Sequence, residues 1–223
     1  MVENEQKIVV VKDGPYMVQG SIPLVRKSEV MSEYGEPLTW RKNETIKTGS
    51  TYALCRCGKS EQKPFCDGTH SYEPFDSTEM ADPGPLANRQ TVYSGTGIQV
   101  QDDRSLCMHA GFCGNRLTNI WEMTSDSEDT QVRAQIMSMI EKCPSGALAY
   151  TIESDGESIE PDLPVEIAVT PDGALWVSGN IAVERADGLD FEVRNRVTLC
   201  RCGRSKNKPL CDGAHKDVGF KAE

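Results

Sequence analysis

The sequence predicts an α+β fold with small sheets, in which two β-rich units enclose a central unit with one helix. Three observations predict this architecture. A cysteine–histidine motif occurs twice, at residues 55–70 and 200–215. A stretch rich in β-branched residues precedes each copy, and an amphipathic helical pattern lies between two polar linkers. We therefore expect three units, at residues 1–80, 88–155 and 163–223.

The first β-rich stretch begins at Lys7 and turns at Asp13-Gly14, a dipeptide typical of β-hairpins. A matching stretch turns at Asp172-Gly173. The two copies are 159 residues apart at this turn but 145 residues apart at the cysteines, so the first repeat contains 14 extra residues, which we place within 26–44. The residues that we expect in the sheet core are Val9, Val11, Val18, Trp176 and Ile181.

Each motif has the spacing C-x-C-x8-C-x3-H and supplies three thiolates and one imidazole. The donors are Cys55, Cys57, Cys66 and His70 in the first copy, and Cys200, Cys202, Cys211 and His215 in the second. Such donors suit a soft or borderline metal, which leaves zinc and iron–sulfur as alternatives. Structural zinc sites usually pair C-x2–4-C knuckles, whereas both motifs begin with C-x-C, and this favours iron–sulfur.

The residues between the ligands also recur, and each motif ends in Cys-Asp-Gly-x-His. This pattern resembles the CDGSH iron–sulfur family, with the departures Thr69 and Ala214 in a small-residue position. The resemblance implies one [2Fe-2S] cluster per motif, with the two cysteines of C-x-C on one iron and the third cysteine and the histidine on the other. Since CDGSH domains are usually dimeric, it also implies that the two units pack on each other as an intramolecular pseudo-dimer.

Two further residues recur around each histidine. Asp67 and Asp212 are placed to cap the first turn of a short helix that carries the histidine. Phe75 and Phe220 follow each histidine by five residues and could shield the cluster or close the small core. We expect the second role.

The central unit lies between polar linkers at residues 76–90 and 153–164. Short strands are expected at 91–93, 98–101 and 147–152. Ser125 to Glu128 has the pattern of a capping box, and Pro144 stops the predicted helix. The residues on one face of this helix are Val132, Ile136, Met139, Ile140 and Cys143.

Three cysteines remain, Cys107, Cys113 and Cys143. Their pattern, C-x5-C followed by C-P-S-G-A-L, resembles the single-cluster bacterial ferredoxins, including those that carry [3Fe-4S]. The middle ligand position of that family holds Ala110 here, which cannot bind iron. The resemblance therefore implies either a [3Fe-4S] cluster on three thiolates or a [4Fe-4S] cluster with a non-cysteine ligand, for which His109 is the nearby candidate. Buried free thiols are the structural alternative.

Composition limits the function classes. The chain has nine cysteines, a mean hydropathy of −0.47, and neither an export or transit pattern nor an apolar run of about 18 residues. These features predict a cytoplasmic protein whose cysteines bind metal. The net charge of −10 argues against nucleic acid and anionic membranes and suits partners with basic surfaces. The sequence lacks a nucleophile–base pair, a dinucleotide fingerprint and a nucleotide loop, so we expect no enzyme.

The leading hypothesis is an electron carrier between a reductase and an acceptor, acting as a monomer. A cluster donor or redox sensor is the second, because protonation can detach an imidazole ligand. A zinc-bound scaffold is the third. The first motif has a net charge of +1 and the second +3 before the ligands are counted, with cations expected in exposed loops. This difference predicts a higher potential for the C-terminal cluster.

Overall fold

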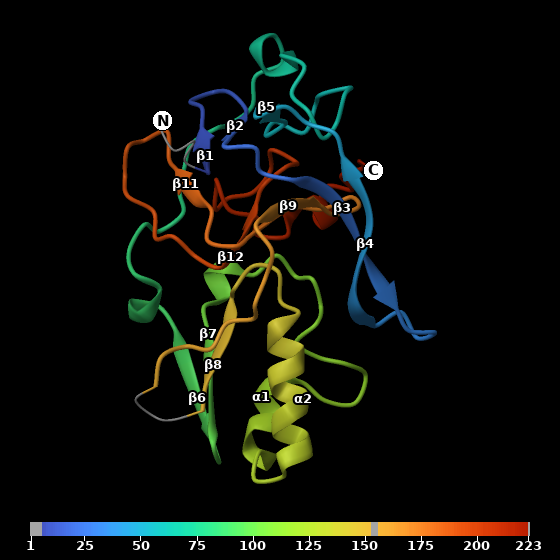
Figure 1. Ribbon diagram of the computed structural model, residues 1–223, viewed down its shortest axis with the longest axis vertical. Coiled ribbons are helices and arrows are strands. Elements are labelled where there is room, and N and C mark those ends of the chain that lie inside the picture. Colours follow the sequence, from blue (N-terminus) through green and yellow to red (C-terminus); the bar gives the residue numbers. More distant parts are fainter. Residues whose placement is uncertain (1–5, 153–155, 223) are drawn as a thin grey trace.

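The computed structural model describes residues 6–152 and 156–222 and has an upper body and a lower lobe (Figure 1). The upper body contains both ends of the chain, drawn in blue and in orange to red, and the lower lobe is the green and yellow central segment. The upper body holds a four-stranded and a five-stranded sheet, and the lower lobe holds a three-stranded sheet. The predicted α+β fold with small sheets is confirmed.

The two repeats share their sheets. The N-terminal strands are β1 (Lys7–Val10), β2 (Tyr16–Gln19), β3 (Leu24–Met31), β4 (Pro37–Ile46) and β5 (Thr51–Leu54). The C-terminal strands are β9 (Glu166–Val169), β10 (Leu175–Ser178), β11 (Ala182–Glu184) and β12 (Arg196–Leu199). Strand β11 pairs in parallel with β1, and β3 pairs in parallel with β9. The C-terminal repeat thus contributes β11 to the four-stranded sheet, and the N-terminal repeat contributes β3 and β4 to the five-stranded one. The two units therefore form an intramolecular pseudo-dimer.

The two cysteine motifs also touch each other through two glycines. A Cβ on Gly58 would lie 2.5 Å from the carbonyl oxygen of Cys202, and a Cβ on Gly203 would meet the carbonyl oxygen of Cys57 just as closely. Both glycines have positive φ, 80° and 74°. Glycine is required here both for its conformation and because the two backbones are in contact.

The predicted core is correct in part. Val18, Trp176 and Ile181 are buried, at 0%, 4% and 3% exposure. Val9 and Val11 are only partly buried, and their neighbours Ile8 and Val10 are in the core instead. The prediction failed by one residue because four consecutive apolar residues, 8–11, leave the register of a period-2 pattern open.

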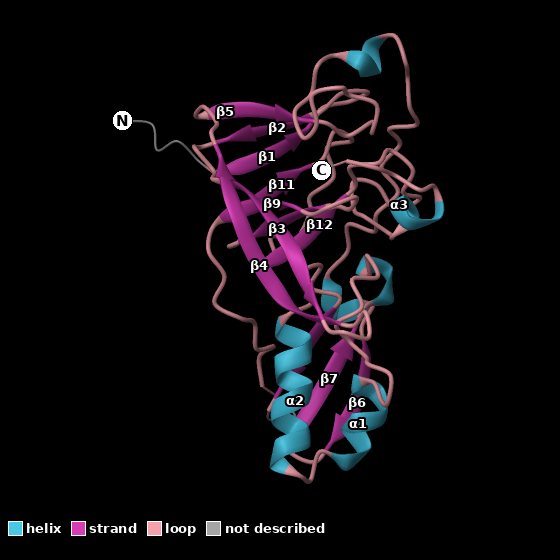
Figure 2. Ribbon diagram, turned by 90° about the vertical axis from the view of Figure 1, so that its right-hand side faces the viewer, coloured by secondary structure: helices cyan, strands magenta, loops and turns pink. Residues whose placement is uncertain are grey.

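The extra residues of the first repeat lie in the β3–β4 hairpin. In Figure 2 these two strands run from the upper body down toward the lower lobe. Trp40 on β4 donates from Nε1 to the carbonyl oxygen of Lys142 at 3.0 Å, and its ring centroid lies 5.2 Å from that of Phe112. The insertion therefore ties the N-terminal unit to the central unit.

The central unit packs helices against its sheet (Figure 2). Its elements are β6 (Thr91–Gly95), β7 (Ile98–Asp102), α1 (Ile120–Met123), α2 (Thr130–Glu141) and β8 (Leu148–Thr151). Ile136, Met139 and Ile140 of α2 are buried as predicted. The predicted capping box is wrong, because α2 begins later. Its N-cap is Asp129, whose carboxylate accepts from the backbone N–H of Gln131 at 2.7 Å.

The two polar segments are mainly irregular. Residues 76–90 contain one short 3-10 helix, Leu86–Asn88. Residues 153–155 of the second predicted linker lie outside the described residues, and the rest of that segment forms a β-bridge between Ile159 and Tyr150. Within the described part of the chain, every helix is too short or too polar to cross a lipid bilayer.

Candidate iron–sulfur sites

The nine cysteines are free thiols in three groups, and the donors of the two outer groups lie in pairs. In the N-terminal motif the Sγ atoms of Cys55 and Cys57 are 3.7 Å apart, and Cys66 Sγ lies 3.4 Å from His70 Nδ1. The equivalent C-terminal distances are 3.8 Å between Cys200 and Cys202, and 3.3 Å between Cys211 and His215. The repeated sequence therefore produces the same donor arrangement twice.

These distances suit two ligands on one metal. A metal–thiolate bond of about 2.3 Å in tetrahedral geometry gives a sulfur–sulfur separation of roughly 3.8 Å, and a sulfur–nitrogen pair gives roughly 3.5 Å. Among the described residues, no three Cys, His, Asp or Glu donors are grouped around a single ion position. Each motif thus offers two half-sites, which fits a two-iron cluster.

The histidines lie on short helices, the 3-10 helix Thr69–Ser71 and α3 (Ala214–Asp217). The prediction that Asp67 and Asp212 are the N-cap residues of these helices is corrected by one position. The N-cap positions are Gly68 and Gly213, with φ of 89° and 87°. The aspartate before each glycine still accepts from the first helical N–H, and its second oxygen accepts from an N–H six residues upstream. Each aspartate therefore fixes the loop between the second and third cysteines.

The arginine between the first two cysteines of each motif is buried. Arg56 and Arg201 are each 1% exposed and donate to backbone carbonyls of the Asp-Gly turns. Their guanidinium carbons lie over the predicted aromatic residues, 5.2 Å from the Phe75 ring and 5.3 Å from the Phe220 ring. The two phenylalanines therefore stack on buried arginines.

The expectation that the motif cations are exposed is correct only in part. Besides the two arginines, Lys208 is buried at 4% exposure, whereas Arg204 and Lys206 are exposed. Arg56 also forms an ion pair with Glu79 at 3.4 Å. Neither that pairing nor the burial can be read from the net charge of a motif.

One thiol of each C-x-C pair has a lowered pKa. The hydrogen bond with Cys57, supported by backbone N–H groups, lowers the pKa of Cys55 to about 6. The hydrogen bond with Cys202 does the same for Cys200, whose pKa is also about 6. A thiolate is the form that binds metal, so each pair presents an anionic ligand near neutral pH.

The histidines of the two motifs differ in burial. His215 is 5% exposed, and burial lowers its pKa below the ordinary value. His70 is only partly buried. The adjacent cysteines follow the same trend, since Cys211 is buried and Cys66 is partly exposed. The C-terminal site is therefore the more enclosed of two similar sites.

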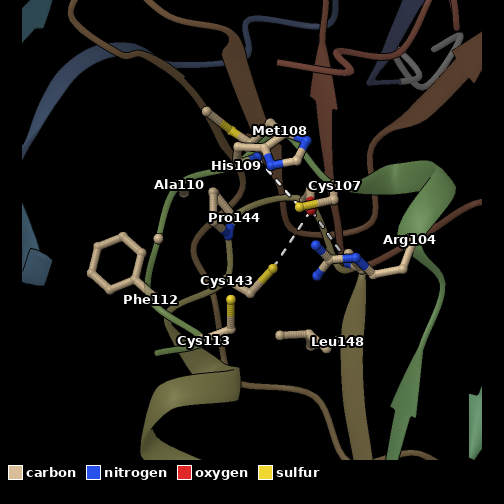
Figure 3. Close-up of a pocket in the computed structure, with 13 residues that line it drawn as sticks. Arg104, Cys107, Met108, His109, Ala110, Phe112, Cys113, Cys143, Pro144 and Leu148 are labelled. Carbon is tan, nitrogen blue, oxygen red and sulfur yellow. Dashed lines mark hydrogen bonds between the residues drawn. The ribbon is translucent and has the colours of Figure 1, made fainter. Parts of the chain in front are cut away.

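The three remaining cysteines face one cavity in the central unit (Figure 3). Cys107 follows a 3-10 helix, Cys113 lies in the next loop, and Cys143 follows the end of α2. The cavity is small, with a volume of about 20 Å³, and Ala110 is among its lining residues. Burial raises the pKa of Cys107 and Cys113. Three thiols around this small, largely apolar pocket could serve as the three cysteine ligands of an iron–sulfur cluster.

The predicted candidate for a fourth ligand, His109, lies at the edge of this group. In Figure 3 its ring is on the opposite side of Cys107 from Cys113 and Cys143. A Cβ on Gly213 would lie 2.6 Å from its Cδ2 atom, so the imidazole packs against the C-terminal motif. Its backbone N–H donates to Cys107 Sγ at 3.4 Å. His109 thus contacts a cysteine through its backbone and the neighbouring motif through its ring.

Sequence reasoning missed Arg196. This arginine on β12 is 1% exposed and donates to the carbonyl oxygens of Ile140, Glu141, Cys143 and Leu148 at 2.8–3.0 Å. It therefore joins the end of α2, at the central site, to the strand that leads into Cys200. No sequence pattern marks this role, because the contacts span about 50 residues.

Comparison with known protein families identifies two models. The model described as an iron-binding zinc finger of CDGSH type matches residues 13–71 and 172–216. The model described as a divergent 4Fe-4S mono-cluster matches residues 93–153. No curated protein and no solved structure gives a significant match. The predicted arrangement, with two CDGSH-type units on either side of a ferredoxin-like unit, is confirmed.

Proposed function

We propose that this chain, which combines two CDGSH-type iron-binding units with a divergent 4Fe-4S mono-cluster unit, carries three clusters and transfers single electrons between a reductase and an acceptor protein. Each outer unit would hold one [2Fe-2S] cluster. The N-terminal ligands would be Cys55, Cys57, Cys66 and His70, and the C-terminal ligands Cys200, Cys202, Cys211 and His215. The central cluster would be bound by Cys107, Cys113 and Cys143. The clusters accept and release the electron, and the chain sets their ligands, burial and surrounding charge.

The observation that carries this proposal is the pairing of the outer donors. Both motifs present a sulfur–sulfur pair at 3.7–3.8 Å and a sulfur–nitrogen pair at 3.3–3.4 Å. One zinc ion would need all four donors of a motif around a single point. Two irons need the donors as two pairs, which is the arrangement present in both copies.

The central site has three cysteines, so a four-iron cluster there would have one iron without a cysteine ligand. The three thiols suit [3Fe-4S], while the matching family model is described as 4Fe-4S. The ring of His109 packs on Gly213, so we propose that this histidine is not the additional ligand. Ala110→Cys should supply a fourth thiolate and raise the central iron content of a three-iron form by one atom. Unchanged iron content and electron paramagnetic resonance (EPR) signal would contradict the ferredoxin-like assignment of these ligands.

The direct test is metal analysis with spectroscopy on the purified protein. Three clusters predict iron and acid-labile sulfide in similar amounts, little zinc, and visible absorption. EPR then separates the sites, because an oxidised three-iron cluster is paramagnetic and an oxidised two-iron cluster is silent. Stoichiometric zinc without sulfide would establish the scaffold alternative and refute the proposal. Because the chain has a net charge of −10, it should bind basic surfaces of its redox partners, and its affinity for them should fall as the salt concentration increases.

A second candidate function is cluster donation, and the partly exposed His70 favours it at the N-terminal site. Mixing the loaded protein with an apo-acceptor distinguishes the two functions. A donor loses iron and sulfide to the acceptor faster than it exchanges electrons. A carrier exchanges electrons and keeps its iron.

A further inference from the structure

The loop that holds the central site lies directly against the C-terminal motif. Met108, next to Cys107, is 4% exposed and packs in one apolar cluster with Cys211 and Ala174. Cys107 and Cys211 are each proposed ligands, one of the central cluster and one of the C-terminal cluster. A buried side chain from the loop of the central site therefore packs directly on a cysteine of the C-terminal motif.

Polar contacts hold the same two segments together. Lys216 donates from Nζ to the carbonyl oxygen of His109, and Asn207 donates from Nδ2 to the carbonyl oxygen of Ser105 at 2.7 Å. Arg196 donates to the carbonyl oxygen of Cys143 at 2.8 Å. Contacts at three separate points keep the two sites in fixed register, and all of them come from the C-terminal unit.

The N-terminal motif is connected differently. Within the described residues, no hydrogen bond joins residues 55–71 to residues 91–152. The N-terminal motif instead touches the C-terminal motif, where Gly58 lies on Cys202 and Gly203 lies on Cys57. By hydrogen bonds and backbone contacts, the three candidate sites are therefore joined in the order central, C-terminal, N-terminal.

We propose that the central site exchanges electrons directly with the C-terminal site, and with the N-terminal site only through the C-terminal one. This inference rests on the proposed function. In each step one electron leaves a reduced cluster and enters the neighbouring oxidised cluster, with no bond formed or broken. A one-electron reductant such as dithionite or a photoreduced deazaflavin supplies the first electron. Met108 and the His109–Gly213 contact form the bridge of the first step.

A matched pair of glycines tests the bridge without removing a ligand. Gly213 and Gly68 occupy equivalent positions with φ of 87° and 89°, so alanine costs the same backbone strain at both. A Cβ on Gly213 would meet His109 at 2.6 Å, whereas a Cβ on Gly68 has nothing within 4 Å. In partly reduced protein, where the C-terminal cluster is paramagnetic, we expect Gly213→Ala to weaken the spin–spin splitting between the central and C-terminal EPR signals, and Gly68→Ala to leave it unchanged. His109→Gly in the Gly213→Ala background should restore it.

Removal of one outer site tests the proposed order of electron exchange among the three sites. Cys66→Ser and Cys211→Ser are matched substitutions in the two motifs. After photoreduction by a fraction of one equivalent, the Cys66→Ser protein should still move electrons between its central and C-terminal clusters at a rate independent of protein concentration. The Cys211→Ser protein should lose this intramolecular rate between its central and N-terminal clusters, so that only concentration-dependent exchange remains.

The outcomes separate this inference from the proposed function. If iron and sulfide are missing from the parent protein, the proposed function fails. If all three clusters are present but Gly213→Ala and Gly68→Ala give equal splitting, the bridge is wrong. A concentration-independent rate retained in Cys211→Ser would refute the order. If Cys211→Ser fails to fold, the comparison of the two glycine variants still decides whether the bridge exists.

Discussion

A pair of equivalent lysines offers a quantitative test of how the fold sets cluster potential. Lys63 and Lys208 precede the proline of each motif, and each donates from Nζ to a serine carbonyl oxygen at 2.5 Å. Lys208 is 4% exposed, and the backbone N–H groups of Met80 and Ala81 donate to its carbonyl oxygen. Lys63 is only partly buried. The same cation thus occurs twice, and the 76–90 segment covers it only in the C-terminal unit.

The hydrogen bonds give the size of the expected effect. The Ser205 carbonyl oxygen binds Lys208 Nζ, and the Ser205 backbone N–H binds the Cys200 thiol, so the charge lies about 8 Å from a proposed ligand sulfur. At an effective dielectric constant near 20, one charge at that distance contributes about 2 kcal/mol. This corresponds to roughly 90 mV for a one-electron couple. For the more exposed Lys63, a dielectric constant near 60 gives about 30 mV.

Lys208→Met should therefore lower the potential of the C-terminal cluster by about 90 mV, because reduction adds an electron that the buried cation stabilises. Lys63→Met should lower the N-terminal potential by about 30 mV. EPR-monitored redox titration of each variant measures both values, and the untouched outer cluster serves as an internal control. Equal shifts at the two sites, or no shift in Lys208→Met, would refute the assumption that burial of the lysine controls its effect.

Three further predictions concern acid, packing and the central site. Acid should bleach the N-terminal absorption first, because His70 is only partly buried while burial lowers the pKa of His215. The contribution of neutral His215 to stability is lost only as pH falls below the usual histidine range. Simultaneous bleaching would contradict this. Gly203→Ala should destabilise the loaded protein by at least about 2 kcal/mol in denaturant titrations, through positive φ and a backbone clash. An unchanged midpoint would show that the two motifs can separate freely. Arg196→Met should leave the buried carbonyls of Ile140 and Leu148 and the partly buried carbonyl of Cys143 without this donor, at a cost of about 2–4 kcal/mol, and should reduce the central EPR signal while the outer signals persist. Loss of all three signals together would indicate general unfolding instead.

The sequence was most informative where a pattern is local. The C-x-C-x8-C-x3-H spacing and the Asp-Gly turns act over fewer than 20 residues, and both describe the folded motifs well. The helix face that includes Ile136 and Ile140 was also predicted, because a period of 3.6 is distinctive over three turns. The start of that helix was not predicted, since Ser125 and Asp129 are both acceptable caps and tertiary packing selects between them.

The sequence was least informative about contacts between units. The sequence predicts that Arg56 and Arg201 are cations in exposed loops, but each is buried between an aromatic ring and a turn. The ring of His109 reads as a possible ligand because it is close in sequence to Cys107, but Gly213, about 100 residues away, determines where it lies. Such placements depend on how the sheets exchange β3 and β11, and no local pattern contains that information.

Having both CDGSH-type units in one chain allows the two copies to become different. A symmetric dimer of identical chains must expose or cover both sites equally. Here Met108 of the central unit packs on Cys211 of the C-terminal motif, and Met80 and Ala81 donate to the carbonyl oxygen of Lys208. His215 and Lys208 are buried, whereas His70 and Lys63 remain partly exposed. Under the proposed function, the covered cluster exchanges electrons inside the molecule and the open cluster is accessible to a partner protein. Under the same proposal, the difference in burial between two otherwise equivalent sites gives the electron path a direction in space, from the central cavity to the less buried N-terminal motif.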